Sequence, residues 1–189
     1  MIFPWDELNV IRSKVEKQEL SETAEDGGKK YDAERCIDIV YEYLEMCWTM
    51  GVENTNENLS TSYAATSPVL SAEMRSEINR KVADKDYKER IREWAEKGDF
   101  EAIIRVAETD ANRVINAASY ETAKRAGAKW KTWVTMDDDK VRATHQPLHA
   151  KTIPIDDYFV TFDGDRALKP GGFTKPENNV NCRCQLTYS

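Results

Sequence analysis

Histidine and cysteine are scarce in this sequence: its 189 residues include two histidines and four cysteines. Long apolar runs are missing as well, since none approaches the ~20 residues that a membrane-spanning helix needs. The first ten residues, MIFPWDELNV, lack the basic stretch and following apolar run of a secretory signal. We therefore expect no membrane partner and synthesis in the cytosol, where thiols stay reduced and a disulfide framework does not form.

An excess of positive charge is also absent. The net charge is −7 at pH 7, and broad, sequence-independent binding of nucleic acid depends on lysine and arginine side chains that neutralise phosphates. Hydrophobic residues make up 40% of the chain and charged residues 32%, which is typical of a folded rather than a disordered protein. The composition favours a protein that acts through contacts with other proteins.

The first two thirds of the chain carry helical patterning. Apolar residues spaced three and four apart predict helices over residues 5–20, 31–50, 71–81, 87–98 and 99–127. Gly51 is predicted to end the second helix, Ser71 to cap the third and Asp99 to cap the last. Residues 52–69 are rich in Asn, Ser and Thr. They predict a long mobile loop, which is either functional or a simple surface excursion.

Beyond Gly127 the pattern changes to that of β structure. The segment KWKTWVTM predicts a strand, and CRCQLTY predicts a short terminal strand. Turn-forming residues separate the short apolar runs between them. The predicted fold class is therefore α+β: a mainly helical N-terminal region with a long central helix over 99–127, followed by a small loop-rich β module over 128–189.

Four soft-metal ligands fall within the predicted module: His145, His149, Cys182 and Cys184. Zinc takes four such ligands in a tetrahedron and can hold a small module together. The Cys-x-Cys spacing is tighter than the usual Cys-x₂-Cys, however, and Pro147 interrupts a regular helical pair of histidines. A redox pair is one alternative, although a Cys-x₂-Cys motif is missing.

The other alternative is structural, and the residues favour it. A strand that holds Cys182 and Cys184 points both sulfurs to one face, against the turn that contains His145. Arg142 and Arg183 are then expected to pair with carboxylates of neighbouring turns. A metal-dependent hydrolase built on Asp137–Asp139 is a third interpretation, but consecutive aspartates are more typical of a solvated turn.

A basic group lies around the predicted end of the long helix and consists of Lys124, Arg125, Lys129 and Lys131. These residues are candidates for a local DNA-binding patch. The alternative is that they complement the negative end of the helix dipole.

The order of these pieces resembles the phage head-morphogenesis family, the minor head proteins similar to the F protein of phage Mu. The resemblance covers about residues 85–189 and rests on the stretches DDKVRATH and NCRC behind a long helix. The residues that match the family pattern are Glu108, Arg113, Asn116, Gly127, Trp133, Asp139, Arg142, His145, Leu148, Pro154, Ile155, Asp156, Asn181, Cys182, Arg183 and Cys184. Residues 1–84 would form a variable leading region, and 85–189 the Mu F-like domain.

This resemblance implies a non-enzymatic minor head protein that acts in procapsid assembly. The expected partners are the portal protein and the capsid or scaffold proteins. The protein would be made in the cytoplasm of a bacterial host and reside in the virion, inside the capsid or at the portal vertex. The alternatives are an internal DNA-associated protein that is packaged or ejected with the genome, and a small metallohydrolase.

The chain departs from the family pattern at the metal ligands. Some members carry Cys-x₂-Cys in the turn and a histidine before the final Asn-Cys-Arg-Cys, which looks like a zinc set. Here Arg142 and His145 stand at the places of the two turn cysteines, and His149 would be a fortuitous fourth ligand. The resemblance therefore leaves two outcomes open, zinc or a turn that Arg142 holds by hydrogen bonds. No other cofactor is expected.

Overall fold

The computed structural model describes residues 31–81 and 84–189. The helix predicted over 5–20 and the polar segment over 21–30 lie outside these residues. The described helices are α2 (Ala33–Leu59), α3 (Pro68–Ile78), α4 (Tyr87–Glu96) and α5 (Phe100–Arg125), and a β-containing C-terminal module (residues 128–189) follows them. The predicted α+β class is confirmed. None of the described helices is both long and apolar enough to cross a membrane.

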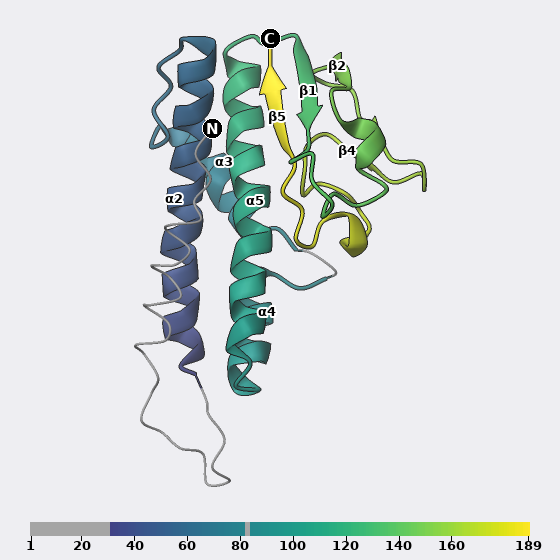
Figure 1. Ribbon diagram of the computed structural model, residues 1–189. Helices are drawn as coiled ribbons and strands as arrows, with labels where there is room; N and C mark the ends of the chain where they lie inside the picture. Colours follow the sequence, from purple (N-terminus) through teal and green to yellow (C-terminus); the bar gives the residue numbers. More distant parts are fainter. Residues whose placement is uncertain (1–30, 82–83) are drawn as a thin grey trace, which may run out of the picture.

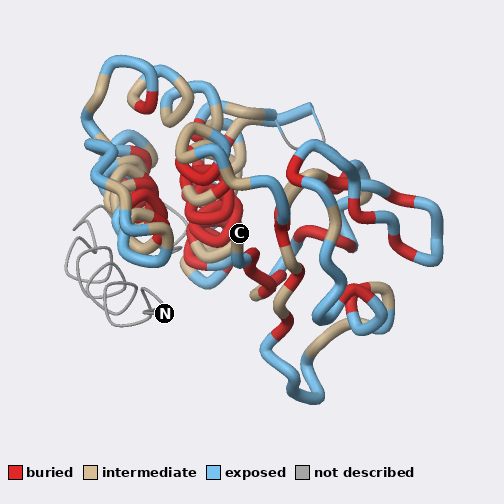
Figure 2. The backbone as a smooth tube through the Cα atoms, turned by 90° about the horizontal axis from the view of Figure 1, so that it is seen from above, coloured by how far each residue is buried: buried red, intermediate tan, exposed pale blue. Residues whose placement is uncertain are grey.

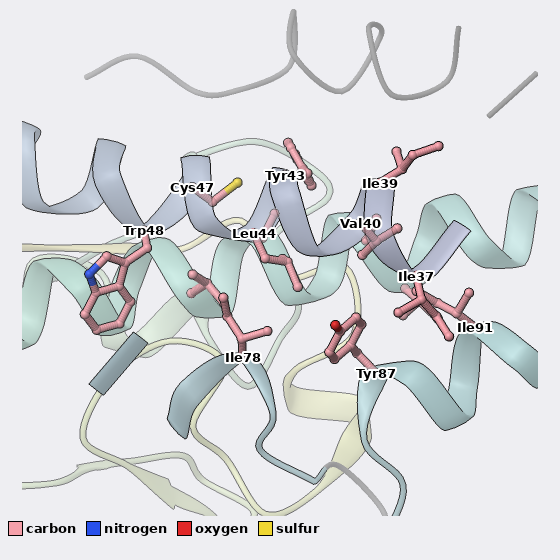
Figure 3. Close-up of a cluster of buried hydrophobic side chains, with 14 of the residues drawn as sticks. Ile37, Ile39, Val40, Tyr43, Leu44, Cys47, Trp48, Ile78, Tyr87 and Ile91 are labelled. Atoms are coloured by element: carbon pink, nitrogen blue, oxygen red, sulfur yellow. The ribbon is translucent and has the colours of Figure 1, made fainter. Parts of the chain in front are cut away.

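Two long helices, α2 and α5, lie side by side and run parallel, while α3 and α4 form the return between them (Figure 1). The direction follows from the contacts, since Tyr31 stacks on Phe100 near the start of both helices and the Tyr63 hydroxyl donates to the Arg125 carbonyl near their ends. The facing sides of both helices are buried (Figure 2). Figure 3 shows Leu44 and Trp48 of α2 in one layer with side chains from α3 and α4.

Gly51 was predicted to end α2, and this prediction is wrong. The glycine instead allows α2 and α5 to come into contact. A Cβ atom on residue 51 would lie 2.6 Å from the Ile115 carbonyl oxygen and 2.7 Å from the Ala118 Cβ. Beyond Gly51 the helix continues to Leu59, because Val52 and Thr55 are buried against the rest of the helical core. The prediction of a loop over 52–69 is therefore wrong for residues 52–59, and also for residues 68 and 69, which begin α3.

The connection that remains, residues 60–67, is tied to the end of α2. The Asn56 side chain accepts a hydrogen bond from the Tyr63 amide and donates one to its carbonyl. Ser67, rather than the predicted Ser71, caps α3, and Pro68 takes its first position, where no amide hydrogen is needed. Asp99 caps α5 as predicted, by accepting a hydrogen bond from the Ala102 amide at 2.9 Å.

The C-terminal module lies against α5 on the side away from α2 (Figure 1). Its antiparallel sheet has the order β2-β1-β5, and a two-stranded hairpin β3–β4 and two 3-10 turns complete it. The elements are β1 (Trp130–Val134), η1 (Gln146–Leu148), β2 (Thr152–Pro154), β3 (Phe159–Val160), β4 (Arg166–Ala167), η2 (Pro176–Asn178) and β5 (Gln185–Tyr188). The terminal strand thus begins after both cysteines, not at Cys182 as predicted.

A buried ion network joins the helices to the module. Arg113 of α5 is 2% exposed, and its guanidinium bonds Glu77 of α3 at 2.5 Å and Asp110 at 3.3 Å. Arg90 of α4 reaches the second oxygen of Asp110 at 2.7 Å, and Lys169 of the module lies 3.5 Å from Glu77. One charged cluster therefore connects three helices and the module.

The module backbone presses directly on this network. Gly171 has φ of +78°, and a Cβ there would lie 2.8 Å from the Arg113 Cβ. Arg80 of the segment after α3 donates to the Gly171 carbonyl at 2.6 Å. Glycine is required at this position both by the left-handed backbone and by the closeness of α5.

The first prediction concerns the contact of α2 with α5. Gly51→Ala is expected to lower the free energy of unfolding by about 1–3 kcal/mol, because overpacking outweighs the gain of ~1 kcal/mol in helix propensity. Urea denaturation measures the change. Glu53→Ala, an exposed position of the same helix, is the matched control and should change stability by less than about 0.5 kcal/mol. Equal stability of the two variants would contradict the close approach.

The second prediction concerns Glu77 and acid. Burial by itself would raise the pKa of Glu77, but Lys169, Arg113 and Arg80 together lower it from 4.5 to about 2. Because the folded-state pKa is depressed, Glu77 contributes stability above pH 4.5 that is lost as the pH falls toward 2. The contribution is about 3 kcal/mol at 1.36 kcal/mol per unit.

Glu77→Gln is therefore expected to be less stable than the wild type at neutral pH and to lose less stability between pH 4.5 and 2. Denaturation at several pH values in this window measures the difference. Glu57→Gln, an exposed position of α2, should follow the wild-type profile. Parallel profiles for wild type and Glu77→Gln would show that the network does not hold this carboxylate ionised.

Candidate metal centre

Three of the four predicted ligands converge in the module core. The Nδ1 atom of His145 lies 3.6 Å from the Cys182 sulfur and 3.5 Å from the Cys184 sulfur. All three side chains are buried, and their ligand atoms lie within 4.8 Å of one another. We refer to His145, Cys182 and Cys184 as the His/Cys cluster.

The backbone before Cys182 and the packing around His145 orient these three side chains toward one another. Asn181 adopts φ of +56°, a conformation that asparagine tolerates better than most residues, and so turns the chain just before Cys182. Asn116 of α5 donates to the Cys184 carbonyl at 3.1 Å and fixes the turn to the helix. The His145 ring packs edge-on against Trp133, with ring centroids 5.4 Å apart. Its other neighbour is the Phe173 ring, which is tilted by 31° with a centroid distance of 5.2 Å.

The two thiols share protons unequally. A hydrogen bond from Cys184 lowers the pKa of Cys182 well below its ordinary value, against the effect of burial, and His145 lowers it further. The same hydrogen bond and burial raise the pKa of Cys184. The first proton of the pair is therefore lost more easily than the second.

The donors fit a soft metal ion such as zinc. Ligands ~2.0 Å (nitrogen) and ~2.3 Å (sulfur) from a tetrahedral zinc lie about 3.6 Å apart, and the two nitrogen–sulfur distances are 3.5 and 3.6 Å. Within the described residues the group has three members and no fourth histidine, cysteine or carboxylate. The Nε2 atom of His145 is buried there without a hydrogen-bond partner, whereas metal-bound histidines usually donate through their second nitrogen.

Two arginines hold the same turn. Arg142 donates to the carbonyls of Glu177 and Val180, so it binds backbone and not the carboxylates that were one expectation. Arg183 forms the predicted carboxylate pair, with two bonds to Asp138 at 2.7 and 2.8 Å. Asp139, the aspartate of the family pattern, is exposed. Its neighbour Asp138 forms the ion pair with Arg183 instead.

His149 does not join the cluster. It is exposed, and its Nδ1 atom lies 2.8 Å from the Thr135 hydroxyl. The 3-10 turn η1 lies between the two histidines and places them differently from an i, i+4 pair on one face of an α-helix. The interpretation of His149 as a fourth ligand is therefore wrong for this structure.

The predicted basic patch is not one open surface. Lys131 is fully buried, its ammonium group donates to the Leu168 carbonyl at 2.7 Å, and burial lowers its pKa to about 8. Lys124 pairs with Asp156 at 2.8 Å, and Arg125 with Glu121 at 2.7 Å. Lys129 remains exposed. The alternation of residues on strand β1 puts Lys131 on the same buried face as Trp133.

Asp165 is a structural residue that the sequence patterns did not single out. Its buried carboxylate accepts hydrogen bonds from the amides of Arg166, Thr174 and Lys175 and from the side chains of Thr174 and Asn178. Burial would raise the pKa of Asp165, but these donors lower it to about 2. Asp165 belongs to the stretch DGD, residues 163–165, which is typical of a turn, and nothing in that stretch distinguishes a buried aspartate from an exposed one.

A cleft of about 810 Å³ lies between α5 and the module, beside the cluster. Glu108 of the family pattern lines it, together with Arg105 and Asn112 of the same helix. Asn181 and Cys182 line its other side. The cleft therefore connects the N-terminal half of α5 with the turn that carries the cysteines.

The chain thus combines two parts. One is a long helix with a buried arginine and a buried asparagine, and the other is a small module that holds the His/Cys cluster. Residues 70–187 match the family described as Phage Mu protein F like protein. This match covers more than half of the chain, and the chain belongs to that family. The resemblance inferred from the sequence is thereby confirmed.

Two curated relatives are similar over part of the chain. The NAD(+)–arginine ADP-ribosyltransferase EFV of Enterococcus faecalis is 36% identical over 89 residues, which are 45% of this chain and 18% of the transferase. The minor head protein GP7 of Bacillus phage SPP1 is 33% identical over 85 residues, which are 43% of this chain and 28% of that protein. The chain thus spans less than a third of either relative. No solved structure matches.

The third prediction separates the two roles of the cluster. If it holds zinc, Cys182→Ser is expected to remove the metal from the purified protein and to lower the melting temperature by about 5 °C or more. Elemental analysis and calorimetry measure the two effects. Cys36→Ser, a buried cysteine of the helical core, is the control. It should lower the melting temperature without changing the zinc content.

A zinc-free wild type whose melting temperature still falls on Cys182→Ser would assign the cluster to packing alone. An unchanged melting temperature would contradict both the metal and the packing role.

Proposed function

We propose that this chain is a non-enzymatic minor head protein that acts in the assembly of a phage head. The family match over residues 70–187 carries this proposal, and the likeness to a minor head protein of a Bacillus phage supports it. Its partners would be the portal protein and the capsid or scaffold proteins, and its place the capsid interior or the portal vertex of the virion.

The geometry suits a rigid assembly component. Helix α5 has 26 residues and is therefore about 39 Å long. The ion network of Arg113 and the bond from Asn116 to Cys184 hold the module against this helix. In this proposal the His/Cys cluster, with or without zinc, closes the turn that carries Arg142 and Arg183.

We also propose that residues 1–84 are the part that varies among relatives and that residues 85–189 form the Mu F-like domain. In space, residues on both sides of this boundary share one core, since Leu44 and Ile78 pack with Tyr87 and Ile91. The helices before and after the boundary would therefore act as one body.

An enzymatic role has less support. The matched stretch is 18% of the ADP-ribosyltransferase, so the likeness does not bring transfer activity to this chain. A DNA-binding role is likewise disfavoured, because Lys131 is buried and Lys124 and Arg125 are paired with carboxylates.

The fourth prediction tests the assembly role. The chain is expected to co-purify with procapsids when it is expressed with its neighbouring portal, capsid and scaffold proteins. Quantitative mass spectrometry gives its copy number, and a few copies per particle that stay with the portal after capsid disruption are expected. Particles made without the portal protein are the control, and they should lack the chain if the portal recruits it.

Absence of the chain from every particle would contradict the minor head role. Retention in portal-free particles would move the contact from the portal to the inner capsid surface.

A further inference from the structure

A recess opens in front of the His/Cys cluster. It is lined by His145, Cys182 and Cys184 and, on its rim, by Met136, Lys140 and Arg142 among others. Its volume is about 10 Å³, close to the ~10–15 Å³ that one water molecule needs. The recess therefore admits a single small group directly beside the three ligand atoms.

Three donors leave a tetrahedral ion one ligand short. Among the described residues, no further histidine, cysteine or carboxylate belongs to the group. Met136 is the one remaining soft donor among the residues lining the recess, and its side chain is partly turned to solvent, with the residue 43% exposed. The fourth position is thus left either to Met136 or to a group that enters from outside.

The charge around the recess is positive. Within the described residues, the hydrogen bonds of the Arg142 guanidinium go to the carbonyls of Glu177 and Val180, which carry no net charge. The Lys140 side chain is exposed, and its positive charge acts on the nearby Asp138 carboxylate. Arg183 also lines the recess and pairs with the same Asp138. Three cations thus face the recess with one carboxylate paired to them among the described residues, and this excess favours an anion over a neutral ligand at this position.

The recess adjoins the larger cleft along α5. It shares Lys140, Arg142, Asn181, Cys182 and Arg183 with this cleft of about 810 Å³. The cleft is therefore the side from which a small ion would approach the cluster.

We propose that the recess is an exchangeable anion position, in which a compact anion completes the coordination of a soft metal held by His145, Cys182 and Cys184. This inference rests on the metal that the proposed function allows. In this proposal the positive charge of Lys140 favours anions over neutral ligands, and the small volume of the recess excludes large ones. The cluster is then an open three-ligand site and not a closed structural one.

The fifth prediction uses cobalt(II) and azide as probes. Cobalt added to the metal-free protein is expected to give thiolate charge-transfer absorption, which reports ligation by the cysteines. Azide should then shift the d–d bands in a saturable manner, and acetonitrile, a neutral linear molecule of similar size, should shift them less at equal concentration because it carries no charge. Lys140→Glu is expected to raise the azide concentration for half-saturation roughly five-fold, since it replaces a nearby positive charge by a negative one.

Two variants serve as controls. Lys129→Glu makes the same charge change at an exposed residue that does not line the recess, and it should leave the azide titration unchanged. Met136→Leu removes the competing soft donor and should likewise leave it unchanged. A response to azide that appears only in Met136→Leu would assign the fourth position to Met136 and overturn the proposal.

Bands that azide does not move in either the wild type or Met136→Leu would show a closed site and would also overturn it. Equal responses to azide and acetonitrile, with no effect of Lys140→Glu, would overturn the selection of charge. Absence of charge-transfer absorption would remove the metal and this inference together. The co-purification with procapsids would still decide the assembly role independently.

Discussion

The arrangement of this protein depends on one buried positive charge. Arg113 is 2% exposed, and a charge at that depth is tolerated only when it is paired and hydrogen-bonded. Glu77 and Asp110 supply the carboxylates, while Arg90 and Lys169 approach them from α4 and the module. Removing one partner of a buried ion pair typically costs about 3–5 kcal/mol. The helices and the module therefore meet in a single arrangement.

This constraint also sets the position of the His/Cys cluster. Gly171 lies against the backbone of Arg113, and Asn116, one turn further along α5, bonds the Cys184 carbonyl. Asn116 is buried and also bonds the Asn112 carbonyl, so its side chain has one orientation. Contacts with the helix thus help to place the turn that carries the cysteines, and a metal ion bound there would add to them.

Local patterns predicted the fold class, the long helix and its Asp99 cap, because these depend on periodicity and capping within a few residues. The extension of α2 could not be predicted, since a glycine can end a helix or allow a close contact and only its partner, here Ile115, decides which. The scarcity of cysteine and histidine pointed to the three members of the cluster. The burial of Lys131 and the choice of Asp138 over Asp139 depend on side-chain directions that sequence spacing alone does not give.

The charges of the chain also affect which kind of molecule it can bind. The chain carries a net charge of −7, and several of its arginines are engaged internally: Arg113 with carboxylates, Arg142 with carbonyls and Arg183 with Asp138. The net negative charge makes binding to the phosphates of packaged DNA unfavourable for the chain as a whole. In the proposed assembly role, affinity would then come from contacts with other proteins. The positive charge that remains near the cluster is too local for DNA, and it is better matched to a single small anion.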